Sequence, residues 1–188
     1  MHGFPKLPGS SDWPRHSGLL CHITSLPGPG GTGDLGPAAY RFVAQLARAG
    51  QRAWQVLPIG PTGFGDSPYQ TASVLGGNPL LISIDRLMED GLLPAGITSL
   101  APVETSEADF AAAQAYKWPL FERAFRKLFA DVQHAALRAE FGEFAERERA
   151  WLDDYALFMA IKEAQGLRPW TEWPQPLRDR QPSALTDI

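Results

Sequence analysis

The residues best suited to chemistry lie in one short segment, Asp66-Ser67-Pro68-Tyr69-Gln70. A tyrosine between proline and glutamine offers a flat aromatic face on which a sugar ring can stack. The carboxylate, hydroxyl and amide of Asp66, Ser67 and Gln70 can hydrogen-bond to sugar hydroxyls. The same pattern also suits a structural turn in which Asp66 caps backbone amides. The residue types therefore predict a carbohydrate-binding loop and leave the structural turn open as the alternative.

The stretch around this segment, PIGPTGFGDSPYQ over residues 58–70, alternates glycine with proline. Glycine adopts backbone conformations that other residues avoid, whereas proline fixes φ and lacks an N–H donor. A segment that combines the two forms neither helix nor strand, yet it remains stiff. This composition predicts a binding loop held rigid by its scaffold.

A second pattern, GTGDLG over residues 31–36, matches the G-x-G-x-x-G fingerprint of dinucleotide-binding proteins. The fingerprint requires a tight turn after a strand, but residues 24–30 separate this pattern from the preceding predicted strand. Pro37 follows at once, and the next predicted strand ends in LPIG, without an acidic residue to hold a ribose. We therefore interpret residues 31–36 as a rigid connector.

The sequence gives less support for a metal site or a catalytic nucleophile than for the carbohydrate-binding loop. None of the histidines shows metal-ligand spacing or an adjacent pair of carboxylates; they are His2, His16, His22 and His134. Ser25 and Ser67 lie in predicted loops but not in a nucleophile elbow, so no hydrolase triad is expected. The sequence predicts no metal site.

The candidate loop is preceded by a strand–helix–strand pattern. The apolar run Leu19-Leu20-Cys21 is typical of a strand buried on both faces, and RAWQVLPI over residues 52–59 predicts a second strand. Between them, residues 37–50 predict a helix that starts with Pro37 and ends at Gly50, with Tyr40, Val43 and Ala47 at helical spacing. Such a unit predicts parallel strands, whose carboxyl ends carry the site in this class of fold.

Beyond the loop, the sequence predicts an extended segment at Leu80–Ile84 and a short helix ended by Gly91. Ser106 and Asp109 are spaced as a capping box, so they predict the start of a helix. Pro119 is expected to divide the helical stretch that follows.

The last predicted helix covers RAEFGEFAERERAWLDDYALFMAIKEAQG, with a possible break near Gly142 and an end at Gly166. Its aromatic face is expected to belong to the core; it comprises Trp151, Tyr155, Phe158 and Met159.

Composition narrows the class of protein. A net charge of −4 over 188 residues argues against a nucleic-acid partner, which requires a concentrated basic face. Cys21 is the single cysteine, so no disulfide can form within the chain and a reducing cytoplasm is the expected compartment. We recognise no signal peptide and no apolar run of the roughly 20 residues that cross a bilayer, so no membrane partner is expected.

The predicted elements divide the chain into three parts. Residues 1–16 are expected to form a loosely ordered lead-in, residues 17–91 the strand–helix–strand part with the candidate loop, and residues 92–188 a helical subdomain. One such unit leaves a parallel sheet with too few strands to be self-sufficient. We therefore expect this chain to be the amino-terminal portion of a larger parallel α/β protein.

Four long motifs make the sequence similar to a known family: SGLLCHITSLPGPGGTGDLG, AWQVLPIGPTGFGDSPYQTASVLGGNPLLISID, YKWPLFERAF, and WLDDYALFMAIKEAQG followed by PWTEWPQPLR. Together they resemble amylomaltase, the bacterial 4-alpha-glucanotransferase or disproportionating enzyme, from about residue 16 to about residue 180. The resemblance implies an α/β fold, the amino-terminal portion of a (β/α)8 TIM barrel with an inserted helical subdomain. It also implies transfer of α-1,4-glucan segments to glucose or another glucan by a retaining double displacement, without a cofactor.

The resemblance gives Tyr69 the role of an aromatic platform under the sugar at the cleaved bond, with Asp66, Ser67 and Gln70 as neighbouring substrate-binding residues. The catalytic carboxylates of amylomaltases come from later barrel strands, so the resemblance assigns no catalytic residue here. The implied partners are maltooligosaccharides and glucose. An alternative is a truncated, non-catalytic helical or glucan-binding fragment that is inactive on its own.

Overall fold

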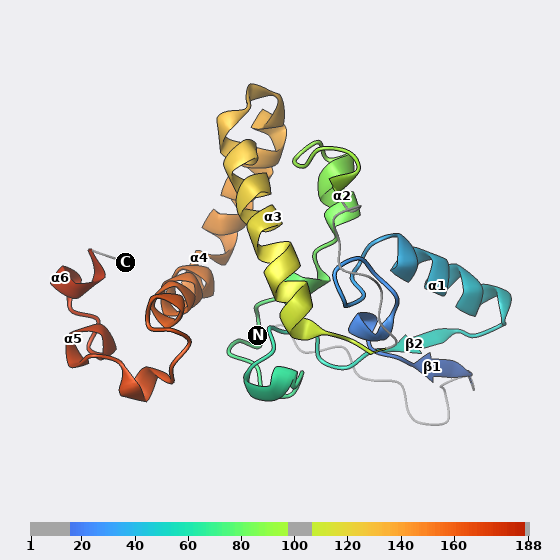
Figure 1. Cartoon of the computed structure of the whole chain (residues 1–188), viewed down its shortest axis with the longest axis horizontal. Helices are drawn as coiled ribbons and strands as arrows, with labels where there is room; N and C mark the ends of the chain where they lie inside the picture. The colour runs from blue at the N-terminus through green and yellow to red at the C-terminus, as the bar shows by residue number, and fades with distance from the viewer. Residues whose placement is uncertain (1–15, 98–106, 187–188) are drawn as a thin grey trace, which may run out of the picture. The chain divides into compact units, whose positions relative to one another are not determined.

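The computed structural model describes residues 16–97 and 107–186. Figure 1 shows the course of the chain through these elements. The strands and α-helices are β1 (Gly18–Leu20), α1 (Pro37–Arg48), β2 (Ala53–Gln55), α2 (Ile84–Glu89), α3 (Phe110–Ala130), α4 (Ala135–Ala164), α5 (Gln175–Arg178) and α6 (Pro182–Leu185). The 3-10 helices are η1 (Ile23–Ser25), η2 (Phe64–Asp66), η3 (Pro79–Leu81), η5 (Val132–His134) and η6 (Trp170–Glu172).

Strands β1 and β2 form a parallel pair in which Leu19 lies opposite Trp54. They lie side by side, with α1 following β1 and leading into β2 (Figure 1). The predicted strand–helix–strand unit is therefore confirmed. The prediction that the first strand is buried on both faces is wrong for the described residues, where Leu19 and Leu20 are 44% and 58% exposed. A strand is buried on both faces only where other elements cover both.

Helix α1 begins at Pro37, and Gly50 beyond its end adopts a left-handed φ of 73°, as the sequence indicated. Its buried face is offset by one residue from the set noted at helical spacing. Ala39 is buried, and the Phe42 ring packs edge-on against Trp54 with ring centroids 5.0 Å apart.

The predicted stripe itself is on the outside of α1. Tyr40 and Val43 are exposed, and so is Ala47. Spacing alone did not separate the two faces, because apolar residues occur on both.

Residues 80–84 form no strand, and only Ile82 and Ser83 within them have extended backbone angles. Asn78 accepts a hydrogen bond from the Leu80 N–H through its side chain, at 2.9 Å, and Pro79 supplies the fixed φ of the first turn. This capped turn forms η3, and α2 then begins at Ile84. Gly91 has a φ of 72° just beyond α2, as predicted.

Helix α3 corrects two predictions. Asp109 is itself the cap, because its carboxylate accepts from the Ala112 N–H at 2.9 Å; Ser106 lies outside the described residues. Pro119 does not divide the helix but lies inside it. Buried residues on both sides of Pro119, Ala113 and Ala124, pack against the rest of the chain and offset the cost of the missing hydrogen bond.

Helix α4 passes through Gly142 without a break and ends at Ala164, and Gly166 beyond it has a φ of 65°. A glycine inside a helix costs about 1 kcal/mol relative to alanine, too little to interrupt a helix of this length. The predicted aromatic face is at least half-buried, and Trp151 packs near Tyr155 with ring centroids 6.2 Å apart.

The chain forms two compact units. Among the described residues, one comprises 16–71, 77–97 and 107–127, and the other comprises 72–76 and 128–186. The predicted division into a part at residues 17–91 and a helical subdomain at residues 92–188 stays a prediction. The first unit has a core around Leu80, Ile84 and Leu93; the core of the second contains Ile161, Trp173 and Leu177.

Within the described ranges, none of the helices combines the length and the apolar character that a bilayer crossing requires.

Candidate functional site

The candidate loop follows β2 and is closed at its base. Thr62 and Thr71 form an antiparallel bridge, so the chain enters and leaves the loop at adjacent points. A second link lies just outside, where the Asn78 N–H donates to the Ile59 carbonyl at 2.8 Å. The predicted stiffness therefore has two sources, the glycine and proline content and the cross-linked base.

Two glycines allow the loop to turn within this bridge. Gly65 has a left-handed φ of 68°, and the next residue, Asp66, has a φ of 55°. A Cβ on Gly63 would lie 2.3 Å from the Gln70 carbonyl oxygen, so only glycine fits where the two sides of the loop approach each other.

Backbone groups of the SPYQ segment are bonded locally. The Ser67 hydroxyl accepts from the Tyr69 N–H at 3.3 Å, and the Gln70 N–H donates to the Ser67 carbonyl at 3.2 Å. The Asp66 N–H donates to the Gly63 carbonyl at 3.2 Å. These bonds hold the turn through backbone groups and the Ser67 hydroxyl.

The four predicted substrate-binding residues are therefore on one closed turn, with different exposure. The Tyr69 side chain is 71% exposed, and Gln70 is also exposed. Asp66 and Ser67 are half-buried. An exposed ring on a rigid backbone is the geometry that a stacking platform requires, because little motion has to be restricted on binding.

The sequence analysis missed a buried ion pair in the first unit. The Lys117 ammonium lies 2.8 Å from Asp34 Oδ2, and the two side chains are 0% and 4% exposed. The other Asp34 oxygen accepts from the Gly36 N–H at 2.9 Å, just before α1. Each residue left a signal in the sequence. Asp34 is an acidic residue in a glycine-rich connector, and Lys117 is four residues after Ala113, which is buried on the inward face of α3.

Burial and mutual attraction act in opposite directions on this pair. Burial raises the pKa of the Asp34 carboxyl, and Lys117 and the Gly36 N–H oppose that shift. Burial likewise lowers the pKa of the Lys117 ammonium, and Asp34 opposes that shift. The attraction between the two groups therefore opposes the effect of burial on each of them.

The GTGDLG stretch is an irregular connector between β1 and α1, as interpreted. Among the described residues no group of three or more histidine, cysteine, aspartate or glutamate side chains is placed to hold a metal ion. His22 follows β1 and is half-buried, and burial lowers the pKa of its imidazole.

Comparison with known proteins gives consistent matches. A family model for 4-alpha-glucanotransferase matches residues 21–188. The 4-alpha-glucanotransferase of Thermus thermophilus is 48% identical over 174 residues, which are 93% of this chain and 34% of that protein. That of Synechocystis is 47% identical over 172 residues, which are 91% of this chain and 34% of that protein.

A solved structure also matches. It is the amylomaltase from Streptococcus agalactiae in complex with acarbose, with a TM-score of 0.82 and 36% identity. The match covers 93% of this chain and 35% of that one. The chain thus spans about a third of the length of the relatives that it matches. Since the family model covers nearly all of the sequence and the fold agrees with that of an amylomaltase, the chain belongs to the 4-alpha-glucanotransferase family.

Proposed function

We propose that this chain is the amino-terminal part of an enzyme that transfers α-1,4-linked glucan segments from a donor to glucose or another glucan. Tyr69 supplies the aromatic platform of the donor-side sugar pocket. Asp66, Ser67 and Gln70 surround it with groups that hydrogen-bond to hydroxyls. The complete protein forms a (β/α)8 barrel in which β1 and β2 are early strands.

One observation carries this proposal: the exposed Tyr69 ring on a loop whose base is closed by the Thr62–Thr71 bridge. The loop follows the carboxyl end of β2, the edge at which barrel enzymes carry their sites. The family membership of the chain supports the same activity, and the related amylomaltase is seen with acarbose.

Glucan transfer requires catalytic groups in addition to the sugar-binding residues of this chain. Retaining transfer uses one carboxylate as nucleophile and another as acid/base, with the carboxyl groups about 5 Å apart. We place both on later barrel strands of the complete protein. The part played by this chain is to hold the donor sugar so that those groups reach the bond to be cleaved. We expect the enzyme to act in the cytoplasm without a cofactor.

The test is to incubate the complete protein with maltotriose and to separate the products by chromatography. Transfer predicts free glucose together with maltooligosaccharides longer than maltotriose. Hydrolysis gives only shorter sugars, so the absence of longer products would contradict the proposal. Adding glucose in excess should shift the products toward maltose, because glucose then competes as the acceptor.

A non-catalytic glucan-binding fragment is the alternative, and no feature of the structure favours it over the enzyme. It predicts that residues 1–188 alone bind acarbose as tightly as the complete protein does.

A further inference from the structure

The Lys117 ammonium contacts more than Asp34. Its Nζ also donates to the carbonyls of Leu80 and Ile82, at 2.7 Å and 3.1 Å. An ammonium has three N–H donors, so each has a partner. Lys117 therefore connects α3 to two segments of the first unit, the connector at Asp34 and the turn at residues 80–82.

The turn is held at three successive carbonyls. Leu80 and Ile82 accept from Lys117, and between them the Leu81 carbonyl accepts from the Leu35 N–H at 3.0 Å. Leu35 is the residue next to Asp34, so the two residues of the connector and Lys117 fix the turn together. A backbone bound at three consecutive carbonyls has little freedom to shift.

The turn at residues 80–82 also fixes the base of the candidate sugar loop. Asn78 caps the turn through the Leu80 N–H and accepts from the Leu81 N–H at 3.0 Å. Its own N–H donates to the Ile59 carbonyl, where the chain enters the loop. A continuous series of hydrogen bonds therefore runs from Lys117, through the turn and Asn78, to Ile59.

A buried ion pair is a poor means of gaining stability, because desolvation of the two charges offsets their attraction. Apolar residues of similar volume often stabilise a protein equally well or better. What an apolar side chain cannot do is hold two carbonyl oxygens at fixed positions. The contacts of Lys117 thus point to a role in positioning.

We propose that Lys117, held by Asp34, is a positioning residue for the donor sugar: it fixes the turn at residues 80–82 and thereby the base of the loop that carries Tyr69. This inference rests on the proposed function. It assigns Lys117 no contact with substrate, and its effect reaches the sugar only through the backbone.

The decisive variant is Lys117→Met combined with Asp34→Asn in the complete protein. The double substitution leaves neither charge buried alone, and the amide oxygen can still accept from the Gly36 N–H. We expect the melting temperature to fall, because the carbonyls of Leu80 and Ile82 lose the donor that Lys117 supplies. The deciding readouts are therefore binding and kinetics of the folded molecules. The dissociation constant for acarbose and the KM for maltotriose should both rise by about tenfold or more, because small misplacements of a binding group cost this much.

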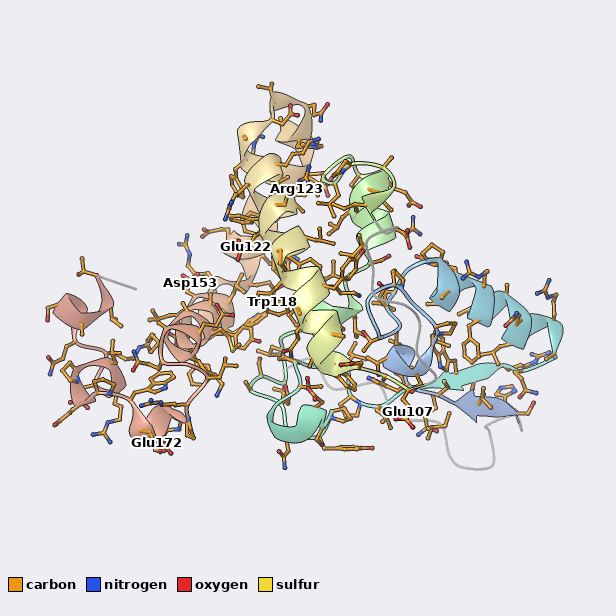
Figure 2. The ribbon with its side chains drawn as sticks, in the orientation of Figure 1. Glu107, Trp118, Glu122, Arg123, Asp153 and Glu172 are labelled. Carbon is orange, nitrogen blue, oxygen red and sulfur yellow. The ribbon has the colours of Figure 1, made fainter. Side chains whose placement is uncertain are left out.

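A matched control removes an exposed ion pair from the same helix. Arg126 and Glu122 lie 3.0 Å apart with side chains 78% and 61% exposed, and Glu122 is labelled on α3 in Figure 2. Arg126→Met with Glu122→Gln should change the acarbose dissociation constant and the KM by less than about twofold, as expected for surface pairs.

A merely structural role makes a different prediction. Partial unfolding lowers the concentration of active enzyme, and hence the apparent kcat, but leaves the dissociation constant and KM of the folded molecules unchanged. Unchanged values in the Lys117 double variant, or equal changes in the control, would overturn the inference.

Hydrogen exchange provides a readout that does not depend on activity. In the double variant the Asn78 amide should exchange faster than in the unmodified protein, while amides in the middle of α1 keep their rates. An unchanged Asn78 rate would refute the proposed link even if the enzyme were inactive. If the unmodified protein forms no products longer than maltotriose, the proposed function is contradicted instead.

Discussion

At the scale of single residues, the position of Tyr69 depends on its neighbours more than on its own contacts. Gly63 permits the two sides of the loop to approach each other, and Gly65 and Asp66 adopt left-handed conformations. The ring is exposed, and the backbone around it is bonded locally. A side chain with few intramolecular contacts can be changed with little effect on folding, which makes its functional role testable.

Tyr69→Ala should lower kcat/KM for maltotriose by about fivefold, since an aromatic contact contributes about 1 kcal/mol and 1.36 kcal/mol corresponds to a factor of ten. Tyr69→Phe retains the stacking face and should keep most of the activity. The melting temperature should hardly change, because the side chain is 71% exposed. Steady-state kinetics and thermal melting measure the two effects.

Tyr40→Ala is the control, because Tyr40 is a tyrosine of comparable exposure, 61%, on α1. Its removal should leave kcat/KM within about twofold, as for surface substitutions away from a site. If Tyr69→Ala lowered activity and melting temperature in proportion, Tyr69 would be a structural residue.

The loop that carries Tyr69 was predicted from the sequence because glycine and proline mark a rigid loop by composition alone. The structure has a closed loop there with Tyr69 exposed, and the role of Tyr69 in binding sugar stays a prediction. Lys117 and Asp34 were missed because they are 83 positions apart, and a contact over that separation follows from tertiary packing. An isolated lysine on an apolar helix face was the available signal.

At the scale of elements, α3 combines a proline with an otherwise regular helix. Pro119 is exposed, so its ring contributes no core packing that would explain its presence. It was predicted to end one helix and start another, because proline lacks the N–H and crowds the preceding turn. The buried side of the helix, including Lys117, overrides this local preference.

Pro119→Ala should therefore stabilise the protein. Alanine restores the missing backbone hydrogen bond and relieves the steric clash, together up to about 3 kcal/mol. We expect a higher melting temperature by a few degrees, measured by calorimetry, with kcat/KM unchanged.

Pro119→Gly provides the comparison, since it restores the N–H but adds backbone freedom worth about 1 kcal/mol. It should fall between the proline and alanine forms. A loss of stability in the alanine variant would show that the native helix needs the distortion that proline introduces.

Element boundaries followed local chemistry where a cap or a left-handed glycine fixed them. Pro37 and Gly50 bounded α1 correctly, and Gly166 closed α4. The prediction of an extended segment at residues 80–84 holds only for Ile82 and Ser83, because an apolar run of that length suits a strand and a turn equally well. The Asn78 cap decided between them.

At the scale of the whole molecule, the apolar surface of the strand pair is informative. Leu19 and Leu20 of β1 are 44% and 58% exposed in the described part of the chain, and Ile59, four residues beyond β2, is 51% exposed. Exposed strands with apolar side chains are prone to pair with other chains. The relatives are about three times as long as this chain, and we propose that the rest of the barrel covers this surface in the complete protein.

Residues 1–188 produced alone should accordingly bind a hydrophobic dye such as ANS, whereas the complete protein should bind little. Leu20→Ser in the short chain should reduce the dye fluorescence, because it removes part of the exposed apolar surface. Equal fluorescence from the short chain and the complete protein would show that the barrel does not cover the strands.

The bridge between Thr62 and Thr71 has a consequence for how this family can diversify. The chain enters and leaves the loop at neighbouring points, so residues 63–70 form a closed segment between them. Under the proposed function, we expect an exchange of these residues for those of a relative to alter donor preference and to leave the path of the flanking backbone unchanged.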